Sequence, residues 1–112
     1  MEIGKREEQG IIILEPDGRL DSNSAPALEE EIDTIESGDS GYHLLIDFSK
    51  VEYISSAGLR VVLKTVKERQ SSSRSFAVSN MQDHVREVFE ISGFDSYVKI
   101  HPDTTHAIKS FS

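Results

Sequence analysis

Two adjacent serines, Ser55 and Ser56, stand directly before an amphipathic run. A serine hydroxyl at the start of a helix can act as a cap, accepting a hydrogen bond from a free backbone amide. It can also accept a phosphate, because a helix N-terminus stabilises an added anion. As a cap, Ser56 is expected to bond to the amide of Gly58 or Leu59. The small residues Ala57 and Gly58 favour the role of phosphate acceptor over that of a plain cap, because they leave the hydroxyl open to a partner.

A phosphate on this hydroxyl would add about −1.5 to −2 charges. The helix N-terminus would tolerate the charge, so we expect the domain to stay folded. A partner docked around the neutral hydroxyl would be repelled if it presented a carboxylate or nucleotide phosphates there. The pattern therefore predicts a switch that changes binding and preserves the fold.

The sequence lacks the residue patterns that other kinds of functional site require. The chain has no cysteine, which excludes disulfides, thiolate zinc sites and cysteine nucleophiles. His101, His106 and Asp103 are near one another in sequence but have no further ligand, so we predict no metal. We expect all histidines to lie at the surface, at His43, His84, His101 and His106. Without a nucleophile elbow or a glycine-rich phosphate loop, we predict no enzyme and no cofactor.

Length and charge restrict the class of protein. The 112 residues predict one domain over 1–112. The net charge of −8 argues against nucleic acid or anionic membranes and favours a basic protein surface as partner, although it is also typical of plain solubility. The charged start and the short apolar runs predict neither export nor membrane insertion. A cytoplasmic protein is expected.

Hydrophobic patterning predicts alternating strands and helices. A first hairpin is suggested by a weak extended segment around Ile3, a turn at Gln9-Gly10 and a strand at 11–14. A second turn is predicted at 16–18. Helices are predicted around residues 28–35, ending at Gly38, and around 59–66, 85–89 and 107–111, with a loop at Ser71 to Ser75. Further strands are predicted at 44–48, 76–78 and 97–100. This order predicts an α/β fold with a mixed, mostly parallel sheet flanked by about four helices.

The segment 47–59 links the central strand to the second predicted helix, where α/β folds display function. Its residues resemble the signature of the bacterial anti-sigma factor antagonists, a branch of the sulfate-transporter and anti-sigma-antagonist (STAS) family. The resemblance rests on Asp47-Phe48-Ser49, Val51, Tyr53-Ile54, Ser55-Ser56 and Gly58-Leu59. It extends to Gly18-Arg19-Leu20-Asp21 with Ala25, and to Phe89-Glu90-Ile91-Ser92-Gly93-Phe94.

The resemblance implies a function and a site. Unmodified, the chain would bind and sequester a serine kinase of the histidine-kinase-like ATPase fold that doubles as an anti-sigma factor. Phosphorylation on Ser56 would release it, and a serine phosphatase of the PP2C type would remove the phosphate. The implied partner-binding residues are Asp21, Ser22, Ser55, Ser56, Ala57, Gly58 and Arg60. The family often has Asp before the phosphorylated serine, so Ser55 is a competing acceptor here.

Plainer interpretations stay open. Asp21 can be a turn-forming residue, while Asp47 and Glu52 are expected to serve structure. Arg60, Lys64 and Lys67 can form a solvated face instead of a docking surface. The alternative function is a subunit without a switch, a regulatory or ligand-sensing partner of a transporter or a weak nucleotide binder, in which Ser56 is only a cap. We expect a monomer.

Overall fold

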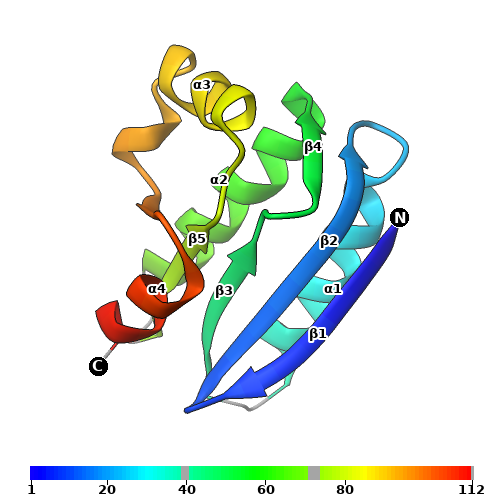
Figure 1. The fold of residues 1–112 in the computed structure, drawn as a ribbon. Coiled ribbons are helices and arrows are strands. Elements are labelled where there is room, and N and C mark those ends of the chain that lie inside the picture. Colours follow the sequence, from blue (N-terminus) through cyan, green and yellow to red (C-terminus); the bar gives the residue numbers. More distant parts are fainter. Residues whose placement is uncertain (39–40, 71–73, 112) are drawn as a thin grey trace.

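Strands and helices alternate along the chain (Figure 1), as the hydrophobic patterning predicts. The computed structural model describes residues 1–38, 41–70 and 74–111. The strands are β1 (Glu2–Glu8), β2 (Ile11–Leu20), β3 (His43–Asp47), β4 (Val51–Ile54), β5 (Phe76–Ser79) and β6 (Lys99–His101). The helices are α1 (Ala25–Ser37), α2 (Ser56–Gln70), α3 (Asp83–Ile91), the short 3-10 helix η1 (Phe94–Ser96) and α4 (Thr104–Ser110).

The strands form one mixed sheet in the order β1-β2-β3-β5-β6. The β1–β2 hairpin is antiparallel, whereas the pairs β2–β3, β3–β5 and β5–β6 are parallel. The long strand β2 also pairs in parallel with β4, through Gly18 to Leu20, beyond the stretch that pairs with β3. The predicted mostly parallel α/β architecture with about four helices is confirmed.

Both faces of the central strands are covered, which explains their nearly continuous apolar runs. On β2, Ile12 and Leu14 face the large core under α1 and α2, whereas Ile11 and Ile13 face a smaller cluster with Ala107 of α4. Figure 1 shows α1 and α2 side by side on one face of the sheet and α4 on the other. Period-two alternation along β2 thus divides one apolar run between two cores.

The predicted turn at Pro16 to Gly18 is wrong, because β2 continues through it to Leu20. Pro16 lies between the stretches that pair with β3 and β4, where its missing N–H breaks neither pairing. Gly18 has a φ of 112°, and the register of the β2–β4 pairing shifts between Gly18 and Arg19. The glycine therefore marks a bulge within a strand.

Three further expectations need correction, and one predicted loop lies partly outside the described residues. Strand β4 interrupts the segment that was expected to be a plain connection, and β6 begins at Lys99 instead of Tyr97. His43 and His101 are half-buried, while His84 and His106 are exposed as predicted. Residues 71–73 of the predicted loop are outside the described part of the chain.

Candidate functional site

The ends of β2 and β4 bring two distant segments together. Leu20 pairs with Ile54 in parallel register, and the amide of Ser55 donates a hydrogen bond to the Leu20 carbonyl at 2.9 Å. Asp21 follows β2 directly and Ser56 begins α2 directly after this junction. The predicted acidic residue and the predicted phosphate acceptor therefore lie at the same edge of the sheet, at the carboxyl ends of parallel strands.

The two serines have different environments. The carbonyl of Ser55 accepts from the amide of Leu59 at 3.0 Å, so Ser55 holds the cap position in front of α2. The predicted capping bond from Ser56 to Gly58 or Leu59 is absent, because Ser56 is itself the first helical residue. The Ser55 hydroxyl is buried and has no hydrogen-bond partner in the part of the chain that the structure describes, whereas Ser56 is exposed.

Gly58 is buried, and its small size serves packing. A Cβ at this position would lie 2.8 Å from Cγ1 of Ile54, 2.8 Å from Cγ of Leu20 and 3.0 Å from the Leu20 carbonyl oxygen. The predicted open approach to the hydroxyl is therefore not what Gly58 provides. It lets α2 begin in contact with the ends of β2 and β4, which fixes where Ser56 emerges.

Asp21 organises the turn between β2 and α1. Its Oδ1 accepts from the amide of Asn23 at 3.0 Å and from the amide of Ser24 at 3.3 Å. The Ser24 hydroxyl in turn donates to the Arg19 carbonyl at 2.6 Å. The turn-forming interpretation of Asp21 is confirmed, and the turn holds the half-buried carboxylate beside the start of α2.

A shallow groove of about 320 Å³ runs between α1 and α2 next to Ser56. It brings together three of the predicted partner-binding residues, Ser22, Ala57 and Arg60. The rest of the lining is Ala25, Pro26 and Glu29 of α1 and Val61 and Lys64 of α2. Of these, Ala25 belongs to the family motif and Lys64 to the possible docking surface, whereas the sequence did not indicate Pro26, Glu29 or Val61.

The two cations of the groove differ in their partners. Nζ of Lys64 lies 2.8 Å from Oε2 of Glu29 and 3.6 Å from Oδ1 of Asp33. The hydrogen bond that Lys64 donates to the Glu29 carboxylate raises the pKa of Lys64. Arg60 is exposed and forms no ion pair within the described residues, so of the two side chains it is the one whose charge is left for a partner.

An exposed aromatic residue lies near the same edge. The guanidinium carbon of Arg19 lies 4.2 Å from the ring centroid of Tyr53, and Arg19 Nε is 3.8 Å from Oδ2 of Asp21. Tyr53 is 39% exposed. Sequence reasoning placed Tyr53 in the family motif without a role, although an exposed tyrosine next to a site is a contact residue that interfaces favour.

The described residues contain no group of three or more side chains suited to holding a metal ion. The His106 amide donates to Oδ1 of Asp103 at 2.8 Å, and Nδ1 of His106 contacts the same oxygen at 2.8 Å. The amide hydrogen bond, followed by the side-chain contact, lowers the pKa of Asp103. Burial lowers the pKa of His101, and the charges of His106 and Lys99 lower it further. Within the described ranges, no helix is long and apolar enough to cross a membrane.

Several known proteins resemble this chain along most of its sequence. The model of the STAS domain family matches residues 2–107. One relative is BtrV of Bordetella bronchiseptica, which carries the name "Putative anti-sigma factor antagonist". It is 35% identical over 103 residues, which cover 91% of this chain and 87% of that protein. The anti-sigma-B factor antagonist of Listeria monocytogenes is 31% identical over 103 residues, covering 89% and 86%.

The fold is shared with the anti-sigma factor antagonist SpoIIAA in two forms. The unphosphorylated form has a TM-score of 0.80 at 20% identity, covering 97% of this chain and 95% of that one. The phosphorylated form from Bacillus has a TM-score of 0.75 at 17% identity, covering 99% and 100%. Because the family match spans nearly the whole sequence and relatives named anti-sigma factor antagonists align along most of it, this chain belongs to the STAS domain family.

Proposed function

We propose that this chain is a phosphorylation-switched anti-sigma factor antagonist of the cytoplasm. Unmodified, it binds and sequesters a serine kinase of the histidine-kinase-like ATPase fold that doubles as an anti-sigma factor. A phosphate on Ser56 releases that partner, and a PP2C-type phosphatase restores binding. The chain acts as a monomeric substrate and regulator, not as a catalyst. The names of its relatives support the antagonist role.

The observation that carries the proposal is the difference between the two serines. A kinase must reach the hydroxyl oxygen it modifies. Ser56 is exposed and its hydroxyl has no partner within the described residues, whereas the Ser55 hydroxyl is buried. This favours Ser56 over Ser55 as the acceptor.

The surroundings of Ser56 suit a switch in binding. The first amides of α2 and the helix dipole stabilise an added anion, so the modified domain stays folded. Arg60 follows Ser56 by four residues on the same helix, which places the two side chains on neighbouring turns of one face. SpoIIAA retains this fold with and without phosphate, which supports the same tolerance here.

Electrostatic repulsion at short range explains the release of the partner. Asp21 already places a carboxylate at this edge of the sheet, and the phosphate adds up to about two more negative charges. A partner that presents a catalytic carboxylate and nucleotide phosphates to Ser56 is then repelled, since juxtaposed like charges cost several kcal/mol. The neutral hydroxyl carries no such cost.

The test uses affinity-tagged chains expressed in the organism of origin, with co-purified proteins quantified by mass spectrometry. We expect a kinase of the stated fold with the wild type and with Ser56→Ala, and at least a roughly tenfold lower yield with Ser56→Asp. Thr105→Asp is the matched control, because it adds the same charge at an exposed position in the first turn of α4.

Equal kinase yields with Ser56→Asp and the wild type contradict the proposal. So does an equal loss with Thr105→Asp, because negative charge anywhere on the surface would then be sufficient. A constitutive subunit that co-purifies with every variant indicates the alternative without a switch.

A further inference from the structure

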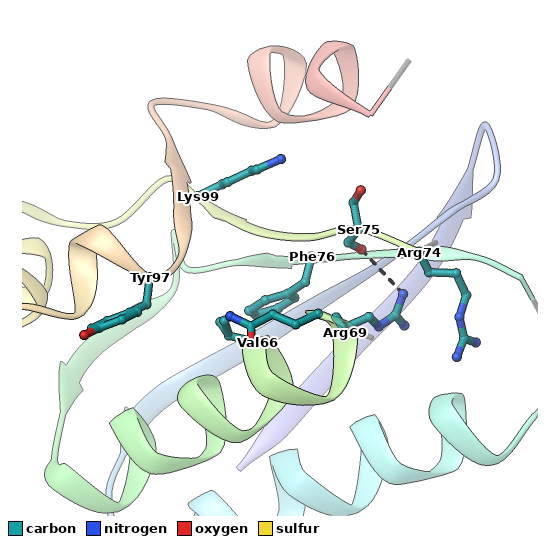
Figure 2. Close-up of a pocket in the computed structure, with 8 residues that line it drawn as sticks. Val66, Arg69, Arg74, Ser75, Phe76, Tyr97 and Lys99 are labelled. Carbon is teal, nitrogen blue, oxygen red and sulfur yellow. Dashed lines mark hydrogen bonds between the residues drawn. The ribbon is translucent and has the colours of Figure 1, made fainter. Parts of the chain in front are cut away.

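A second hollow lies at the other end of α2. Its volume is about 250 Å³, and it is lined by Val66, Arg69, Gln70, Arg74, Ser75, Phe76, Tyr97 and Lys99. Figure 2 shows these side chains coming from three segments: the end of α2, the start of β5, and the stretch from η1 to β6. We call it the α2–β5–β6 pocket. Ser56 and Arg69 are separated along α2 by about 20 Å, at 1.5 Å per residue.

The charged lining residues of the α2–β5–β6 pocket are all cations, Arg69, Arg74 and Lys99, in a chain whose net charge is −8. Oε1 of Glu36 accepts from Nε of Arg69 at 2.7 Å, and Oε2 of Glu36 lies 3.6 Å from Nη2 of Arg74. Glu36 lies outside the lining, as does Glu68, which also acts on Arg69. The lining therefore concentrates positive charge where the rest of the chain is acidic.

Arg69 is held rigidly in the wall of the pocket. Its side chain is 3% exposed, and besides Glu36 its Nη1 donates to the carbonyl of Tyr42 at 2.8 Å and to that of Ser75 at 3.4 Å. Its Nη2 is buried without a hydrogen-bond partner among the described residues. A buried guanidinium stays charged, and an unsatisfied donor on it is costly. An anion in the pocket would lie against a preformed donor group.

The other side of the pocket is apolar and aromatic. Val66 and Phe76 are buried beneath it, and Tyr97 is 63% exposed, one of the most exposed large hydrophobic residues of the described chain. Lys99 is exposed on the neighbouring strand and forms no ion pair within the described residues. An exposed tyrosine ring beside these cationic side chains suits a ligand that has both a planar ring and a negative group.

We propose that the α2–β5–β6 pocket binds a small phosphate-bearing ligand with a planar ring, its phosphate against Arg74, Lys99 and the Arg69 guanidinium and its ring against Tyr97. The pocket volume is below the roughly 300–1,000 Å³ of drug-sized sites, so the ligand is compact. Because the pocket is at the far end of α2 from Ser56, this proposal is independent of the phosphorylation switch.

The test is a titration of the ¹⁵N-labelled chain followed by amide NMR shifts, with phenyl phosphate, inorganic phosphate and phenol as probes. We expect phenyl phosphate to shift the amides of Arg74, Ser75 and Lys99 to saturation. Inorganic phosphate should shift the same amides with lower affinity, and phenol should shift none. Shifts centred on the start of α2, or no saturable shift, overturn the proposal.

Three variants at exposed positions test the assignment without disturbing the core. Lys99→Gln should weaken phenyl phosphate by roughly tenfold, the value of one charge-assisted hydrogen bond. Tyr97→Ala should lower its affinity to that of inorganic phosphate. Lys67→Gln is the control, because Lys67 is an exposed cation of α2 outside the pocket. Equal weakening by Lys67→Gln would show nonspecific attraction between charges. Full affinity in Lys99→Gln would show that Lys99 does not hold the phosphate. Either result overturns the proposal.

Discussion

The amide of Ser55 donates to the carbonyl of Leu20 at 2.9 Å, which ties the start of α2 to the end of β2. The same junction buries the Ser55 hydroxyl and leaves Ser56 exposed. One backbone hydrogen bond thus helps to decide which of two identical side chains a partner can reach. It also keeps Asp21 and Ser56, which are far apart in sequence, at one edge of the sheet.

Ser56→Asp should leave the fold intact. The new carboxylate lies in the first turn of α2, where the helix dipole favours negative charge, so the free energy of unfolding should change by no more than about 1 kcal/mol. Urea denaturation measures this, with Ser56→Ala as the uncharged comparison. A large loss of stability in Ser56→Asp alone would mean that the start of α2 does not tolerate an anion.

Gly58→Ala should destabilise the chain. The added Cβ would lie 2.8 Å from side-chain carbons of both Leu20 and Ile54, so α2 must shift, at a cost of about 1–3 kcal/mol. Thermal unfolding checks this against Gly38→Ala, whose Cβ has no neighbour closer than 3.5 Å. Gly38→Ala should be neutral or stabilising. Equal stability of the two variants would contradict the close packing at Gly58.

Glu36→Gln should destabilise the chain by about 1–3 kcal/mol, because it leaves the buried Arg69 without its counter-charge. Glu29→Gln is the matched control, since it removes the same charge from α1 in an exposed pair with Lys64. Its effect should be smaller. Chemical denaturation of both variants gives the comparison, and equal losses would show that burial of Arg69 adds nothing.

His101 should titrate below its ordinary pKa of 6.5, because burial disfavours its charged form. A lowered pKa in the folded state stabilises the fold above pH 6.5, and this contribution is lost as the pH falls from 6.5 through the lowered value. The NMR signal of the His101 ring, assigned with His101→Gln, gives the midpoint. A midpoint at or above the value in the urea-unfolded chain would contradict this environment.

The sequence was sufficient for much of the fold because buried strands and amphipathic helices have strong periods. The apolar runs at 11–14 and 44–48 predicted β2 and β3, and the stripe from Leu59 to Val66 predicted α2. Strand β4 was missed because only Val51 and Ile54 of its residues are buried, which leaves no period to detect. The turn predicted at Pro16 was wrong because tertiary pairing of β2 overrode a local signal.

The site was predictable in place but not in detail. The motif indicated Ser56, whereas burial of the Ser55 hydroxyl depends on how α2 meets the end of β2, which no local pattern encodes. The role of Gly58 depends on the same contact. Arg69 shows a missed signal: it follows Val66 by three residues and continues the buried stripe of α2, so a buried cation was indicated by spacing.

Peptide mapping by mass spectrometry of the chain isolated from its own cells tests the central claim most directly. A fraction should carry a single phosphate, and fragmentation across Ser55 and Ser56 should place that phosphate on Ser56. Phosphate confined to Ser55 would contradict the site, because that hydroxyl is buried. Absence of phosphate under all growth conditions would contradict the switch itself.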